Sequence, residues 1–70
     1  MKLQKTVGAK IRAARLNKEL SQAEMEGRTG INQGNLSRME NGQKDIHLST
    51  LERIAEAMGK DVKINLEDNR

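Results

Sequence analysis

The chain contains no cysteine, and this absence limits what its 70 residues can fold into more than any other feature. Disulfides and thiolate metal sites are excluded, and the single histidine, His47, cannot form a zinc cluster alone. A domain of this size buries only about 60% of the surface that its unfolded chain would expose. We therefore expect a fold held by apolar packing alone, with a core that is either economical or shared with a partner.

The chain also lacks aromatic residues, and its net charge of +3 is unevenly distributed. Without aromatic rings it has none of the stacking platforms that most binders of single strands and RNA use. Residues 1–44 hold nine basic and four acidic side chains, whereas residues 45–70 hold four basic and six acidic ones. This asymmetry suits a polyanion such as duplex DNA as partner of the first part, and it also fits an ordinary solvated surface.

Apolar spacing and capping residues predict the first two helices. A helix over residues 3–17 is predicted by a single apolar stripe, which consists of Leu3, Val7, Ile11 and Ala14. Ser21 followed by Glu24 has the spacing of a capping box. This spacing predicts a second, short helix that begins at Gln22 and ends near Arg28.

A third helix follows a turn at Gly30, a residue suited to the left-handed conformation that ends a helix. Asn32 can cap this helix, and Asn41-Gly42 terminates it. Residues 22–41 thus form a short helix, a turn and a second helix, as in a helix-turn-helix that binds DNA. In such a motif the first helix braces the second, whose N-terminal part can enter a groove about 12 Å wide.

The last part of the chain predicts one more helix and a strand. Ser49 and Glu52 supply a second capping-box spacing for a fourth helix that ends at Gly59. Its apolar face consists of Leu48, Leu51, Ile54, Ala55 and Met58. We therefore predict an all-α fold of four helices with a short C-terminal β-strand. Residues 1–60 form the helix-turn-helix domain, and residues 61–70 form the strand and tail.

The predicted strand follows from the alternation of Val62, Ile64 and Leu66 with polar residues. A lone strand cannot satisfy its own backbone groups, and no second strand is predicted in the chain. The same strand of a second copy is therefore the simplest partner. Such a dimer would complete the core and would match the two-fold symmetry of a palindromic site. The alternative is a tail that is disordered or packed on a helix.

The third helix is predicted to present a polar face to solvent. At 100° per residue, Leu36 and Met39 point into the domain. The outward positions are Gln33, Gly34, Asn35, Ser37, Arg38 and Asn41. Gln33 has the amide geometry for bidentate contact with adenine, and Arg38 can reach guanine or a phosphate. Gly34 lets the backbone approach DNA closely. In isolation these are ordinary solvated residues, but their place in the motif favours base reading.

Separate blocks of the sequence, in the right order and spacing, carry a resemblance to a known family. They are Val7-Gly8-Ala9-Lys10-Ile11-Arg12, Leu20-Ser21-Gln22, Thr29-Gly30-Ile31, Leu36-Ser37-Arg38-Met39-Glu40-Asn41-Gly42 and Leu51-Glu52-Arg53-Ile54-Ala55. In these blocks the chain resembles the phage repressor and Cro type of helix-turn-helix family, also called the XRE type. The resemblance covers nearly the whole helical part. It implies a lambda-repressor-like domain with helix 32–41 in the major groove.

The resemblance also implies roles for individual residues. It assigns base reading to Gln33, Gly34 and Arg38. It assigns contacts with the DNA backbone to Gln22, Asn35 and Asn41, and we add as positioning residues Asn32, Ser37 and Lys44. It further implies a structural pair between Arg15 and Glu40. Periodicity agrees with this pair, because Glu40 falls beside Leu36 rather than on the outer face, and a buried pair can fix orientation.

One position departs from the family pattern. Glu26 follows Met25 where the family usually has a small residue, often Ala, that packs close to the recognition helix. Glu26 must therefore extend outward or change the angle between the two helices. Gly27 is about 1 kcal/mol worse than Ala as a helix former, and it can let the backbone adjust.

These observations predict a dimeric, sequence-specific transcription regulator that binds duplex DNA without a cofactor, and the resemblance favours a repressor. Catalysis is not expected, because the only histidine, His47, lies in a connecting segment and Ser37 has no oxyanion loop beside it. A rival hypothesis is an antitoxin-like module that binds a toxin protein and regulates its own operon. No segment approaches the about 20 apolar residues of a membrane span, and residues 1–5 lack an apolar signal core. We therefore expect a cytoplasmic protein with no membrane partner.

Overall fold

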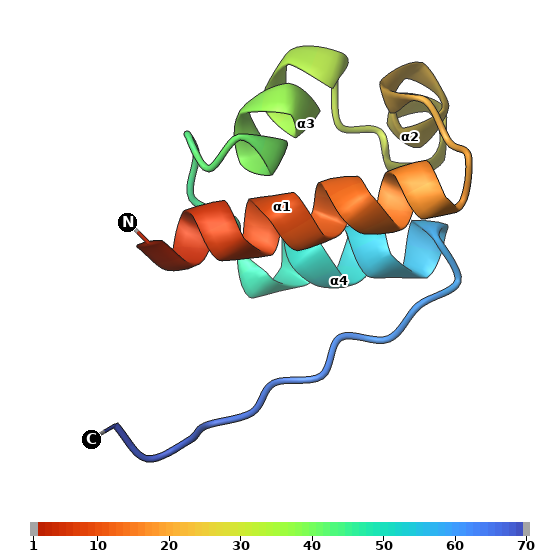
Figure 1. The fold of residues 1–70 in the computed structure, drawn as a ribbon. Helices are drawn as coiled ribbons and strands as arrows, with labels where there is room; N and C mark the ends of the chain where they lie inside the picture. The colour runs from red at the N-terminus through yellow and green to blue at the C-terminus, as the bar shows by residue number, and fades with distance from the viewer. Residues whose placement is uncertain (1, 70) are drawn as a thin grey trace.

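Four helices make up the regular structure of residues 2–69, which are the residues described by the computed structural model. They are α1 (Lys2–Asn17), α2 (Gln22–Thr29), α3 (Gln33–Glu40) and α4 (Leu48–Ala57). In Figure 1, α1 crosses the middle of the molecule, with α2 and α3 on one side of it and α4 on the other. α3 packs against α1 and α2, and α2 packs against α4. The predicted all-α fold is confirmed. None of these helices is long and apolar enough to cross a membrane.

The helix ends around the turn between α2 and α3 follow the predicted caps. Ser21 Oγ accepts the backbone N–H of Glu24 at 3.0 Å, and the backbone N–H of Ser21 donates to Glu24 Oε1 at 2.9 Å. Gly30 ends α2 with a φ of 78°. Asn32 Oδ1 accepts the backbone N–H of Asn35 at 2.8 Å and so caps α3. Local signals therefore place both helices of the motif within one residue of their predicted bounds.

The turn between α1 and α2 contains a residue in an unfavourable backbone conformation. Glu19 has a φ of 56°, in the left-handed region that favours glycine. The backbone N–H of Leu20 donates to the carbonyl oxygen of Arg15 at 3.1 Å, the 6→1 bond of a Schellman motif. Leu20 is buried in the core. We infer that core packing holds the turn at a residue type that would otherwise avoid it.

Two glycines let the backbones of α1 and α3 touch. A Cβ on Gly8 would lie 2.2 Å from the carbonyl oxygen of Met39 and 2.7 Å from that of Glu40. Just beyond α3, a Cβ on Gly42 would lie 2.5 Å from Cγ of Lys5. The C-terminal end of α3 therefore rests on α1 at a distance that only glycine permits.

The core lies between the four helices. Its buried apolar side chains are Ile11, Leu20, Met25, Ile31, Leu36, Met39, Ile54 and Met58. Two leucines from the predicted apolar faces lie outside it, because Leu3 is 63% exposed and Leu48 is 69% exposed. The apolar faces of α1 and α4 thus extend beyond the part of each helix that the core covers.

The predicted start of α4, with Ser49 as its N-cap, is wrong. The helix begins at Leu48, after an N-cap at His47 that makes no side-chain capping bond, so Ser49 lies inside the helix. The early start is closed by a bond of 2.9 Å from the backbone N–H of Leu51 to the carbonyl oxygen of His47. A side-chain cap is worth only about 1 kcal/mol. Two further residues of helix outweigh a Ser49 cap here.

The strand predicted from Val62, Ile64 and Leu66 is not formed in the described chain. Residues 60–69 adopt neither helix nor strand, and Arg70, the last residue of the predicted tail, lies outside the described residues. Figure 1 shows this tail running back beneath α4, on the side away from α2 and α3. A strand needs a neighbouring strand to pair its backbone groups, and the single chain supplies none there.

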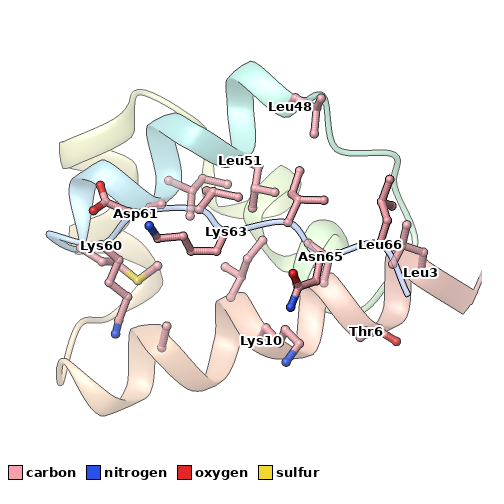
Figure 2. A pocket seen from close by; sticks show the side chains of 18 residues that line it. Leu3, Thr6, Lys10, Leu48, Leu51, Lys60, Asp61, Lys63, Asn65 and Leu66 are labelled. Atoms are coloured by element: carbon pink, nitrogen blue, oxygen red, sulfur yellow. The ribbon is translucent and has the colours of Figure 1, made fainter. Parts of the chain in front are cut away.

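The tail crosses an apolar groove between α1 and α4. The groove has a volume of about 620 Å³, and it is bordered by both helices and by residues 60–66. Figure 2 shows Leu3, Leu48 and Leu66 near one end of it. The tail does not fill the groove, because Ile64 remains 66% exposed and Leu66 remains 96% exposed.

Candidate nucleic-acid interface

The outer face of α3 holds the three residues predicted to read bases. Gln33, Gly34 and Arg38 are all exposed. On the opposite side of the helix, Leu36 is only 1% exposed and Met39 is 5% exposed. Since α3 packs on α1 and α2 through this buried side, its polar face points away from the rest of the domain. The face offers an amide, a bare backbone segment and a guanidinium to a partner.

Two side-chain oxygens accept hydrogen bonds from backbone amides at the start of α3. Glu26 Oε1 accepts the backbone N–H of Gln33 at 3.1 Å, and Asn32 Oδ1 accepts that of Asn35 at 2.8 Å. A carboxylate is favourable here because the N-terminus of a helix carries partial positive charge. Glu26 thus extends outward from α2, as expected, but it reaches the backbone of α3. The preference of helix N-termini for acidic side chains is the signal that could have identified this contact.

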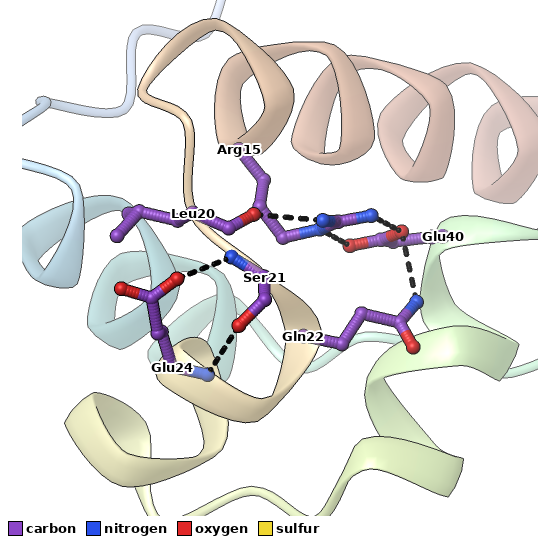
Figure 3. A network of polar contacts seen from close by, with 6 residues as sticks. All are labelled: Arg15, Leu20, Ser21, Gln22, Glu24 and Glu40. Carbon is purple, nitrogen blue, oxygen red and sulfur yellow. Dashed lines mark hydrogen bonds and ion pairs between the residues drawn. The ribbon is translucent and has the colours of Figure 1, made fainter.

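The opposite end of α3 is held by a buried network, drawn in Figure 3. Arg15 donates to both carboxylate oxygens of Glu40, from Nε at 2.7 Å and from Nη2 at 3.0 Å. Its remaining amino group, Nη1, donates to the carbonyl oxygen of Leu20 at 2.8 Å. Gln22 Nε2 donates to Glu40 Oε1 at 3.2 Å. One carboxylate at the end of α3 therefore joins α1 and the first residue of α2, and the structure contains the predicted Arg15–Glu40 pair.

This network satisfies the charged groups that it buries. The Arg15 side chain is 9% exposed and that of Glu40 is 2% exposed. The hydrogen bond to Glu40 raises the pKa of Arg15 further above its ordinary value, so the guanidinium stays charged at every pH at which the domain is handled. No buried side-chain nitrogen or oxygen atom within residues 2–69 lacks a hydrogen-bond partner. The sequence did not predict the contacts from Leu20 and Gln22, because they depend on how α1 and α2 meet.

The predicted positioning residues lie on α3, in the chain just before and after it, and at the start of α2. Asn41 and Asn32 are exposed, one at each end of the helix. Those that are half-buried are Gln22, Asn35, Ser37 and Lys44. Gln22 lies at the start of α2, and one hydrogen of its amide is directed at Glu40. Since an amide nitrogen carries two hydrogens, the second remains for a partner outside the chain.

The bracing helix α2 is itself attached to α4 by two arginines. Arg28 Nη1 donates to the carbonyl oxygen of Ala57 at 2.9 Å, near the C-terminal end of α4. Arg53 Nη1 donates to the carbonyl oxygen of Thr29 at 3.4 Å, at the C-terminal end of α2. A cation is favourable at either place, because the C-terminus of a helix carries partial negative charge. These bonds help to fix the position of α2, against which α3 rests.

Comparisons with known proteins agree with this geometry. Residues 11–64 match the sequence profile of the family described as Helix-turn-helix. The chain is 37% identical over 59 residues to the HTH-type transcriptional regulator y4dJ of Sinorhizobium fredii, a match that covers 84% of this chain and 77% of that protein. Two crystal structures of the clp gene regulator ClgR from Corynebacterium glutamicum are also similar, at 28% and 27% identity, with TM-scores of 0.84 and 0.82. They match 86% and 84% of this chain, and 77% and 63% of their own chains.

Proposed function

Since this chain belongs to the helix-turn-helix family of transcriptional regulators, we propose that it is a repressor that binds a palindromic operator as a dimer. Members of the family bind DNA and are not enzymes. The observation that carries the proposal is the exposed polar face of α3. In the proposal, residues 1–60 bind DNA with helix 32–41 in the major groove, residues 61–70 pair two copies, and the protein acts in the cytoplasm. The choice of repression rests on the resemblance to phage repressors.

Base reading falls to the three exposed residues of α3. The amide of Gln33 can donate to N7 and at the same time accept from N6 of adenine as a bidentate partner, and the guanidinium of Arg38 matches O6 and N7 of guanine. A bidentate contact of this kind discriminates by about 1–3 kcal/mol against the wrong base. Gly34 lies between them and lets the helix backbone approach the floor of the groove.

Phosphate contacts set the register of the helix in the groove but carry no sequence information. The proposed contacts surround the reading face and are made by Gln22, Asn32, Asn35, Ser37, Asn41 and Lys44. Gln22 donates the second hydrogen of its amide, because the first is held by Glu40. Lys44 supplies a point charge just beyond the C-terminal end of α3. Binding is therefore expected to weaken as salt rises.

The proposal is tested by selecting bound duplexes from a random pool at two salt concentrations. A palindromic site is expected, with half-sites about one helical turn apart. Arg38→Ala should relax the preference at one base pair of each half-site, by about 5- to 150-fold in affinity ratio. Lys44→Ala should instead weaken binding to all duplexes alike and reduce the salt slope by about 1. Lys63→Ala is the matched control, because this cation lies on the tail, away from α2 and α3 and on the side of an extended chain opposite to Ile64. The proposal fails if no site emerges or if binding is insensitive to Gln33→Ala and Arg38→Ala.

The apolar groove supports the dimer. Of the six large apolar side chains exposed in residues 2–69, five line the groove, and they are Leu3, Leu48, Val62, Ile64 and Leu66. Apolar surface gathered in one place indicates a partner surface. In the proposed dimer the tails pair antiparallel about Ile64, which sets Val62 opposite Leu66 of the second copy and Lys60 opposite Asp68 of the second copy. The pairing covers the groove and gives one edge of each tail a partner for its backbone groups.

The dimer is tested by light scattering of the intact chain and two tail variants. Ile64→Lys places a charge on the apolar side of the tail and should give the mass of a monomer. Asn65→Glu also adds a charge, but on the opposite side of an extended chain and facing Lys63 of the second copy, so it should leave the dimer intact. A monomeric wild type, or a dimeric Ile64→Lys, would contradict pairing through the tail.

The groove is also what favours the second candidate, an antitoxin-like module. In that function the groove accepts a toxin protein, and the complex represses its own operon. The probe is the protein encoded by a small reading frame beside the gene, which is co-expressed with this chain. A chain carrying both Gln33→Ala and Arg38→Ala that loses DNA binding but keeps the complex, while Ile64→Lys loses the complex, would show both functions in one chain. A chain that forms no complex with the product of the neighbouring gene favours the plain regulator.

A further inference from the structure

An acidic side chain sits directly beside the proposed base reader. Glu26 is half-buried, and its Oε1 atom accepts the backbone N–H of Gln33, the first residue of α3, at 3.1 Å. The side chain of Asn32 accepts the backbone N–H of Asn35, two residues after Gln33, at 2.8 Å. Two of the first three backbone amides of α3 are thus bound by oxygens of the protein itself.

This arrangement changes what the start of α3 can bind. The exposed N-terminus of a helix attracts anions, because its amides point outward and its dipole favours negative charge. On DNA the nearest anions are phosphates. Here the carboxylate of Glu26 already holds the amide of Gln33, and its charge opposes a phosphate that approaches the same place. A phosphate would have to displace Glu26 in order to bind the amide.

The same bond restrains the residue that follows it. The hydrogen bond to Glu26 fixes the backbone of Gln33 relative to α2, so the Gln33 side chain leaves the helix from a fixed point. A base contact depends on such placement, since a bidentate pair needs both of its hydrogen bonds aligned. Arg38 lies more than one turn further along α3 and does not depend on this anchor.

We propose that Glu26 is a positioning residue for base recognition: its carboxylate oxygen aligns Gln33, and its charge keeps DNA phosphates away from the start of α3. The hydrogen bond raises the selectivity of binding, and the charge lowers affinity for any DNA. This inference rests on the proposed function, because it requires Gln33 to read a base.

The two effects are separated by two substitutions. Glu26→Ala removes both the acceptor and the charge, whereas Glu26→Gln removes the charge and keeps an oxygen that can accept the Gln33 amide. Glu56→Gln on α4 is the matched control, because it makes the same change in net charge at an exposed position outside the motif. Each variant is titrated against the selected operator, against a scrambled duplex, and against operators altered at single base pairs.

Glu26→Ala is expected to reduce discrimination about fivefold to tenfold at the base pair that Gln33→Ala identifies. Discrimination at the base pair identified by Arg38→Ala should stay within about twofold of wild type, and Glu26→Ala should have no further effect in a Gln33→Ala background. Glu26→Gln should restore discrimination to within about twofold of wild type. Both Glu26 variants should bind the scrambled duplex more tightly than Glu56→Gln does.

Several results would overturn the inference. Equal losses at both base pairs in a folded Glu26→Ala would show that the helix has only become loose. Equal losses of discrimination in Glu26→Gln and Glu26→Ala would exclude the role of the acceptor. If the Glu26 variants bound the scrambled duplex no more tightly than Glu56→Gln does, the role of the charge would be excluded. A wild-type chain that is insensitive to Gln33→Ala would instead refute the proposed function.

Discussion

Gly8 and Gly27 should respond in opposite directions to the same substitution. Both lie inside helices, where Ala is preferred over Gly by about 1 kcal/mol. A Cβ on Gly27 meets nothing within 4 Å, so Gly27→Ala should realise this gain. A Cβ on Gly8 would lie 2.2 Å from the carbonyl oxygen of Met39. That oxygen belongs to the backbone of α3, so it cannot move aside as a flexible side chain would.

The magnitude follows from the displacement. A Cβ at 2.2 Å from an oxygen is about 0.8 Å inside the 3.0 Å limit that real Cβ atoms respect, so α1 and α3 must separate by about that amount. Overpacking of this kind costs about 1–3 kcal/mol, and the upper end applies where backbone must move. After the gain in helix propensity, Gly8→Ala should lower the free energy of unfolding by about 2 kcal/mol. For a domain of this size that lowers Tm by about 8–16 °C.

Thermal unfolding, followed by circular dichroism at low protein concentration, measures both variants against wild type. Gly27→Ala should raise Tm by about 4–8 °C, opposite in sign to Gly8→Ala. If Gly8→Ala raised Tm as Gly27→Ala does, α1 and α3 would not be in backbone contact.

Three further predictions concern the helix ends and the buried network. Arg15→Met leaves the Glu40 carboxylate buried without its charged partner and should lower the free energy of unfolding by about 3–5 kcal/mol in urea titrations, whereas a loss below about 1 kcal/mol would mean that the pair is solvated. Glu19→Gly removes a Cβ from a left-handed residue and should stabilise the domain by about 0.5–1 kcal/mol, whereas Glu19→Ala, which keeps the Cβ, should not. Hydrogen bonds from the backbone and hydroxyl of Ser21 lower the pKa of Glu24 in the folded domain. The Glu24 carboxylate therefore stabilises the fold fully above the ordinary carboxyl pKa, and this stabilisation is lost as pH falls through the lowered pKa. Glu24→Gln should therefore have a lower Tm than wild type at neutral pH and the same Tm in acid. A difference in Tm that persists unchanged in acid would show that the charge of Glu24 is not what stabilises the helix end.

The features that the sequence predicted well are local. The capping box of Ser21 and Glu24, the left-handed Gly30 and the Asn32 cap each involve residues within four positions of one another. Chemistry over so short a distance needs little tertiary context. The Arg15–Glu40 pair spans 25 residues, and it was predicted only because the resemblance implied it and periodicity placed Glu40 on the inner face.

The features that could not be predicted from the sequence depend on how helices meet in space. Nothing in the residues near Gly8 reveals that the end of α3 will lie against it. The start of α3 favours a carboxylate, but how α2 and α3 meet decides that Glu26 supplies it. The error at Ser49 has a related cause, because a good capping spacing is a weak preference that a longer helix can override. The tail pattern of Val62, Ile64 and Leu66 predicts a strand, but a strand needs a neighbour that the single chain does not supply.

The way in which α3 is anchored has a consequence for how specificity can change. Its N-terminal end is held through the backbone amide of Gln33, and its C-terminal end through the side chain of Glu40. Leu36 and Met39 hold its inner side in the core. None of these attachments uses the side chains at positions 33, 34 or 38. The proposed reading positions are therefore exchangeable: a library that varies them, with proline excluded at all three, should keep the melting temperature of the parent. One scaffold can then be redirected from one operator to another without being redesigned.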